Sequence, residues 1–88
     1  MNRGDAYKLL TARLEQLRGE GYDALLSRVG QPAVSERSRV NGEDVAIETA
    51  VVWAERKRGT IEVRATALGP STWLTQRLDE SFVVGPNE

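Results

Sequence analysis

The sequence predicts an α+β domain in which two N-terminal helices cover one face of a three- or four-stranded antiparallel sheet. Two observations carry this prediction. Apolar residues recur at helical spacing in the first third of the chain, and they alternate with polar residues between Val45 and Leu68. The strand and turn signals all follow the helical ones, which favours antiparallel hairpins. The 88 residues suffice for one domain, which we expect over 1–84 with a frayed tail over 85–88.

The first helix is expected from Asp5 to Arg18 and the second from Tyr22 to Val29. Gly30 and Pro32 end the second helix, because proline lacks the backbone donor that a continuing helix requires. The apolar side chains expected to face the sheet are those of Ala6, Tyr7, Leu9, Leu10, Leu14, Leu17, Leu25, Leu26 and Val29.

The first strand is expected at Val34–Val40, followed by the strong hairpin signal Asn41-Gly42. A two-residue loop would place Glu36 across from Ile47, so that a carboxylate would enter the apolar layer. We therefore expect a four-residue loop, Asn41–Asp44, because a slip of one residue would exchange the two faces. The cross-strand pairs that this register predicts are Val40 with Val45, Val34 with Val51 and Arg37 with Glu48.

The second hairpin is predicted by two alternating runs on either side of the turn Glu55–Gly59. Its alternation places Trp53 on the inward face, where core packing is the expected role. The pairs that keep both apolar sets on one side are Val51 with Val63 and Ile47 with Ala67.

The segment Trp73–Leu78 fits either a strand or one helical turn. A strand is favoured because Trp73 and Thr75 prefer strands and because the third strand needs a partner. The short apolar segment Phe82–Val84 is expected to dock against the rest of the domain.

The order of these parts resembles a family of small uncharacterised bacterial proteins. The elements that carry the resemblance are the segment Tyr22–Pro32, a long hairpin whose second strand ends near Trp53, and the closing segment Asp79–Val84. The spacing of Leu26, Gly30 and Pro32 is also similar to the two-helix, antiparallel-sheet module of BamE/SmpA-type lipoproteins and β-lactamase-inhibitor proteins. The first resemblance implies no activity. The second implies a protein-binding module whose sheet or loops contact a partner.

The composition excludes several chemistries. The chain has no His and no Cys, which removes disulfides, thiolate nucleophiles, the usual general base and nearly all structural zinc sites. The adjacent carboxylates Glu43-Asp44 and Asp79-Glu80 are explained by a turn and a loop. We therefore expect no enzymatic activity, no cofactor and no metal. No apolar run is long enough to span a bilayer, so we expect a cytoplasmic protein without membrane contact.

The outer sheet face is the favoured functional surface. Its expected side chains are Ala46, Glu48, Ala50, Val52, Ala54, Glu62, Arg64, Thr66 and Leu68. Apolar patches rimmed by charge tend to mark association surfaces. We expect a non-enzymatic interaction module that self-associates or binds another protein through this face or a sheet edge, using Ala50, Val52, Leu68 and Trp73. The alternatives are that Phe82–Val84 folds over the face and that Trp73 caps the core edge.

The second hypothesis concerns the cations Arg56, Lys57 and Arg58 at the tip of the second hairpin. Adjacent cations of this kind are suited to binding phosphate or nucleic acid. The formal net charge of -1 means that any such site must be local.

Overall fold

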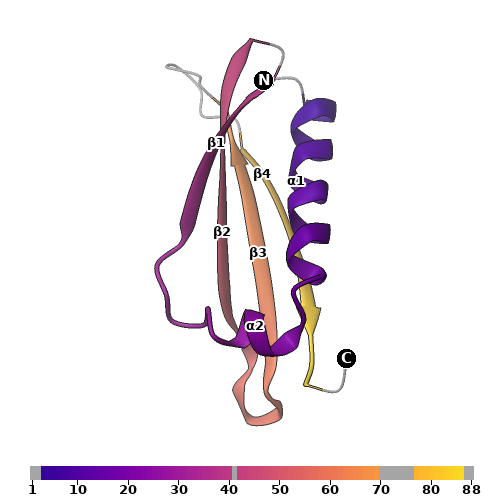
Figure 1. The fold of residues 1–88 in the computed structure, drawn as a ribbon, viewed down its shortest axis with the longest axis vertical. Helices are drawn as coiled ribbons and strands as arrows, with labels where there is room; N and C mark the ends of the chain where they lie inside the picture. The colour runs from indigo at the N-terminus through magenta and orange to yellow at the C-terminus, as the bar shows by residue number, and fades with distance from the viewer. Residues whose placement is uncertain (1–2, 41, 70–76, 87–88) are drawn as a thin grey trace.

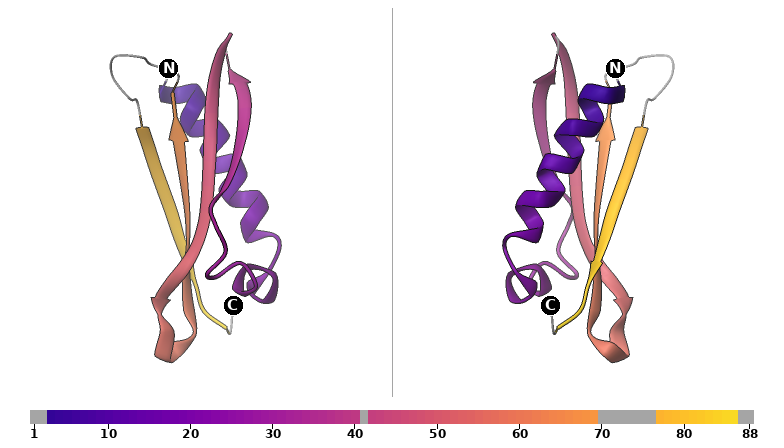
Figure 2. Two further views of the ribbon diagram at one scale, coloured as in Figure 1. Left: turned by 90° about the vertical axis from the view of Figure 1, so that its left-hand side faces the viewer. Right: turned by 90° about the vertical axis from the view of Figure 1, so that its right-hand side faces the viewer.

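The computed structural model describes residues 3–40, 42–69 and 77–86. Two helices precede a four-stranded antiparallel sheet in the order β1-β2-β3-β4 (Figure 1). The elements are α1 (Arg3–Arg18), α2 (Tyr22–Leu26), β1 (Val34–Val40), β2 (Glu43–Glu55), the 3-10 turn η1 (Arg56–Arg58), β3 (Thr60–Leu68) and β4 (Arg77–Val84). Both helices lie on the same side of the sheet (Figure 2). The predicted α+β class is therefore confirmed.

Helix α1 packs across β3 and β4 through one apolar stripe. Ala6, Leu10, Leu14 and Leu17 are buried, as the spacing predicts. The prediction for Tyr7 is wrong, because its side chain is 48% exposed. Residues two apart on a helix lie on nearly opposite flanks, so Tyr7 points away from the flank that carries the partly buried Leu9.

Helix α2 is shorter than expected, since it ends at Leu26 and not at Val29. The Ser27 hydroxyl donates to the carbonyl of Ala24 at 2.6 Å. The following amides then bond to carbonyls three residues back and form turns, up to Gly30 with its φ of 85°. Leu25 is buried as expected, and Val29 still packs against the core from its turn.

The predicted register of the first hairpin is wrong. Glu36 pairs with Ile47, and only residues 41 and 42 connect β1 to β2. The carboxylate of Glu36 does not enter an apolar layer, because it accepts a hydrogen bond from Nη2 of Arg13 on α1 at 2.6 Å. The pairs observed in place of those expected are Val34 with Thr49, Arg37 with Ala46 and Val40 with Glu43. Helix α1 covers β3 and β4, so the helix-side face of β1 remains wet.

The second hairpin has the predicted register, with Val51 opposite Val63 and Ile47 opposite Ala67. The fourth strand also forms, but it begins at Arg77 and includes the segment Phe82–Val84. That segment pairs with β3 at the sheet edge and does not fold over the outer face. Trp73 and the neighbouring residues 70–76 lie outside the described residues.

The core lies between α1 and the helix-side face of the sheet. Its buried apolar residues are Ala6, Leu10, Leu14, Leu17, Leu25, Val45, Ile47, Val51, Ile61, Val63, Ala65, Ala67 and Phe82. Trp53 was expected here but is 38% exposed. It lies on the predicted face, opposite the fully buried Ile61, next to an irregularity in the β2–β3 pairing. The β2–β3 hairpin extends past α2 (Figure 1), and Trp53 is close to its tip, two residues before the end of β2.

Candidate functional site

The outer face of the sheet carries the predicted binding residues Ala50, Val52 and Leu68. No element among residues 3–40, 42–69 and 77–86 covers this face (Figure 2). All three side chains are partly buried by their neighbours in the sheet. The register places Leu68 between Ala46 and Arg77, Ala50 beside Arg64, and Val52 beside Glu62.

Polar side chains occupy the middle of the outer face. Thr66 donates to Oδ1 of Asp79 at 2.7 Å, and Nε of Arg77 donates to both oxygens of the same carboxylate at 3.0 Å. Nε of Arg64 donates to Glu62 at 2.7 Å. These pairs place opposite charges next to one another, and charged side chains reach both ends of the face, with Arg77 beside Leu68 and Glu62 beside Val52.

The apolar side chains of the outer face do not form a continuous strip, because Glu48 stands between Ala46 and Ala50 on β2. The lower end of the face gains a residue that the sequence analysis did not assign to it. Val83 of β4 lies on the same face, on the far side of Glu62 from Val52, and is 53% exposed. The alternation of β4 contains this signal, since inward Phe82 requires Val83 to point outward.

Asp79 offers a test of the polar cluster through pH. The hydrogen bond from Thr66 is the main cause that holds the pKa of Asp79 below its usual value of 3.8, with Arg77 contributing in the same direction. A lowered folded-state pKa stabilises the fold above pH 3.8, and this contribution is lost as the pH falls through the folded pKa. We expect NMR titration to give the Asp79 carboxyl a pKa below 3.8, and we expect Thr66→Val to raise this pKa. An unchanged pKa in Thr66→Val would contradict the assignment.

The tip of the β2–β3 hairpin gathers the predicted cations Arg56, Lys57 and Arg58 into the turn η1. All three are exposed. Nε of Arg58 lies 3.3 Å from Oε1 of Glu55, whereas the guanidinium of Arg56 lies 5.9 Å from the centre of a Trp53 ring. Lys57 makes no ion pair with any residue that the structure describes. The sequence analysis placed Trp53 in the core and did not associate its ring with the cations.

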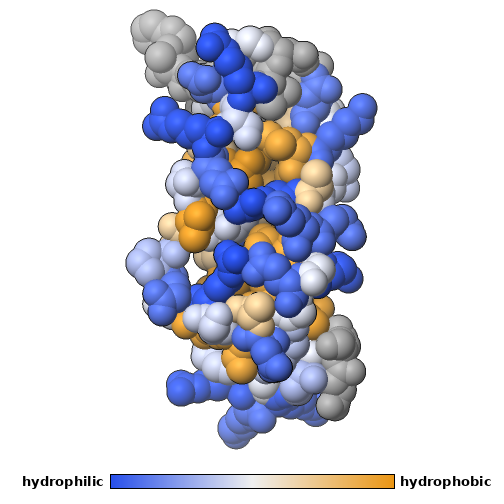
Figure 3. Space-filling model, viewed as in Figure 1, coloured by the Kyte–Doolittle hydropathy of each residue, from blue (hydrophilic) through white to orange (hydrophobic). Residues whose placement is uncertain are grey.

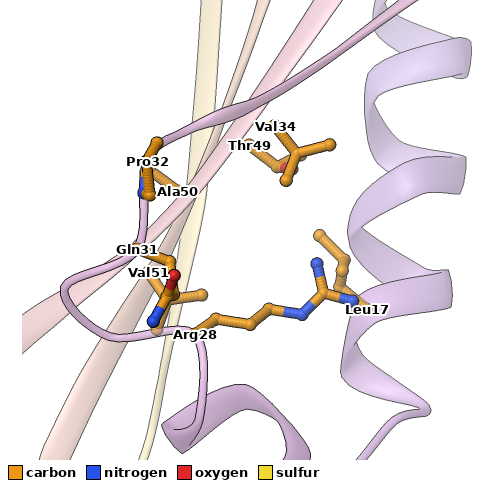
Figure 4. A pocket seen from close by; sticks show the side chains of 8 residues that line it. All are labelled: Leu17, Arg28, Gln31, Pro32, Val34, Thr49, Ala50 and Val51. Carbon is orange, nitrogen blue, oxygen red and sulfur yellow. The ribbon is translucent and has the colours of Figure 1, made fainter.

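A shallow groove runs between α1 and β1 on the helix side of the sheet. Apolar surface shows along this face and is interrupted by charged side chains (Figure 3). One end contains a cavity of about 30 Å³, with Leu17 and Arg28 on one side and Val34 and Thr49 on the other (Figure 4). Such a volume holds about one water molecule, which is too little for a substrate.

Two further findings concern metals and membranes. Within the described part of the chain, no group of three or more acidic side chains is placed to hold a metal ion. None of the helices in that part is both long and apolar enough to cross a bilayer.

Comparisons of the chain with protein-family models, with curated proteins and with solved structures found no match. The functional argument therefore depends on the surfaces described above.

Proposed function

We propose that the protein is a non-enzymatic interaction module that binds a protein surface through the outer face of its sheet, either on a second copy or on another chain. The supporting observation is the lower end of that face, where Val52 and Val83 flank Glu62 with no covering element among the described residues. A flat sheet face that combines exposed aliphatic side chains with paired charges has the mixed composition that is usual for a non-obligate interface.

The energetic case depends on apolar area at the centre of the contact. Burying a valine side chain stabilises an interface by about 1.5 kcal/mol or more, whereas an exposed ion pair such as Arg64 with Glu62 contributes about 0–1 kcal/mol. Val83 has the most area left to bury, because 53% of its surface is exposed. We therefore assign the largest contribution to Val83, with Val52, Ala50 and Leu68 providing the surrounding contact.

Val83→Glu should weaken association at least about tenfold, because the new carboxylate would be desolvated within the contact and would lie beside the carboxylate of Glu62. The matched control is Val34→Glu on β1. Val34 is also an exposed valine on an edge strand, at 44% exposure, but it lies on the helix side of the sheet. Sedimentation equilibrium of the parent and both variants measures self-association, and affinity capture with immobilised parent and variants measures binding to other chains.

Two results would reject this function. A parent that stays monomeric at high concentration and captures no protein would leave the outer face without a partner. Equal losses from Val83→Glu and Val34→Glu would show that added negative charge, and not the outer face, controls association.

A further inference from the structure

The hairpin tip combines two features that the proposed protein-binding function does not use. The first is the group of three exposed cations in η1, Arg56–Arg58. The second is Trp53, a residue that is 38% exposed and whose ring centre lies 5.9 Å from the guanidinium of Arg56. A partly exposed indole next to cations offers a flat stacking surface beside positive charge.

The charge at the tip is local and positive. Glu55 is the one carboxylate in residues 55–58 against three cations, which leaves a net charge of +2 in a chain whose formal total is -1. Glu55 pairs with Arg58, so Arg56 and Lys57 keep their donors available for a ligand. The tip stands at one end of the molecule, past α2, where an extended ligand has access (Figure 1).

The tip is also held in one conformation. Gly59 closes the turn with a φ of 72°, and its amide donates to the carbonyl of Arg56 at 3.1 Å. The hydroxyl of Tyr22 on α2 donates to the carbonyl of Gly59, and the ring of Pro86 lies beside the same residue. These contacts join the tip to α2 and to the C-terminal segment. A preorganised site loses less conformational entropy when it binds a ligand.

We propose that this tip is a second binding site, which takes a nucleotide unit of single-stranded nucleic acid with its base stacked on Trp53 and its phosphates on Arg56 and Lys57. The base accounts for the exposed Trp53 ring, and the phosphates account for the cations. An unpaired base offers a flat face to the indole, and the adjoining phosphates offer negative charge to the cations. In duplex nucleic acid the base faces are already stacked on their neighbours. An acidic peptide would use the cations and leave the ring unused.

The test uses a fluorescein-labelled strand of twelve thymidines and measures its anisotropy against the concentration of the full chain. We expect saturable binding at low salt, with a log–log salt slope of about −1.4 for contacts from the two cations Arg56 and Lys57. Arg56→Ala combined with Lys57→Ala should weaken binding at least about tenfold and reduce the slope by about 1.4. The matched control is Arg37→Ala combined with Arg39→Ala on β1, which removes the same charge elsewhere and should change affinity less than about twofold.

Stacking is tested separately from charge. Trp53→Leu should weaken binding about fivefold or more while leaving the salt slope unchanged, and Trp53→Phe should weaken it less. In a Trp73→Phe background, where Trp53 is the remaining indole, the oligonucleotide should quench the emission. Glu55→Gln should tighten binding, because it releases Arg58 from its ion pair. Circular dichroism confirms that each variant is folded.

Competition distinguishes the sources of the ligand. If thymidine triphosphate displaces the strand at equal nucleotide concentration, the ligand of the site is a free nucleotide, which offers the same base and phosphates. Polyglutamate that displaces it equally well would overturn the proposal in favour of an acidic peptide. The proposal also fails if the parent does not bind at low salt, if the two double variants lose affinity equally, or if Trp53→Leu binds like the parent. If the substitutions at the tip weaken oligonucleotide binding and Val83→Glu binds the oligonucleotide like the parent, this site is separate from the outer face.

Discussion

Leu10→Ala should lower the free energy of unfolding by about 3 kcal/mol. Leu10 is fully buried at the middle of α1, in the layer between that helix and the sheet. The substitution removes apolar contact and leaves a cavity between α1 and the sheet. For a chain of this length, a loss of that size corresponds to a melting temperature about 12–24 °C lower. Thermal and urea denaturation followed by circular dichroism measure both quantities.

The control for this prediction is the adjacent leucine. Leu9 is only partly buried, at the edge of the groove between α1 and β1, so Leu9→Ala should cost about 1 kcal/mol. The two variants delete the same atoms from neighbouring residues, and helix propensity cancels between them. If Leu9→Ala costs as much as Leu10→Ala or more, α1 packs with a different rotation about its axis.

The part of the sheet that α1 covers could be predicted from the sequence, because the position of the helix and the alternation of apolar residues in β3 select the same register. Helix α1 covers β3, and every second residue of β3 is apolar, from Ile61 to Ala67. A slip of one residue would have exposed all of these side chains to water. The register between β2 and β3 was therefore predictable from alternation alone, and the sequence analysis obtained it correctly.

The first hairpin could not be predicted by the same reasoning, because that reasoning assumed that the helices cover the whole face. One long helix covers only part of a four-stranded sheet, and β1 lies beyond it. Glu36 and Ser38 stand on the helix side of β1 together with Val34, and the polarity of these two residues was itself the signal that this part of the face is exposed to water. The ion pair between Glu36 and Arg13 depends on the distance between α1 and β1, which alternation does not report.

The candidate sites show the same limit. Alternation correctly placed Trp53 on the helix side of the sheet, but it does not report where the helical layer ends. Trp53 is 38% exposed and lies three residues before the turn η1, near the end of β2. Val83 was missed because Phe82–Val84 was interpreted as one docked unit, whereas pairing with β3 sends alternate residues to opposite faces.

Gly59→Ala should lower the free energy of unfolding by about 2 kcal/mol, through two effects that a control can separate. The φ of 72° at Gly59 strains any residue with a side chain, and a Cβ there would lie 3.1 Å from the hydroxyl oxygen of Tyr22. Gly30 has a similar φ of 85°, but a Cβ at that position meets no atom within 4 Å. Gly30→Ala therefore reports the backbone strain alone, for which we expect about 1 kcal/mol.

The contact with Tyr22 accounts for the remaining difference, and a double-mutant cycle measures it. Tyr22→Phe removes the hydroxyl that donates to Gly59, which should cost about 1 kcal/mol alone. The same change also removes the oxygen that a Cβ would meet. Gly59→Ala should therefore cost less in the Tyr22→Phe background than in the parent, approaching the value for Gly30→Ala. Strictly additive costs would mean that Tyr22 does not hold the hairpin tip, and the rigidity assigned to the tip would then have to come from the Pro86 contact alone.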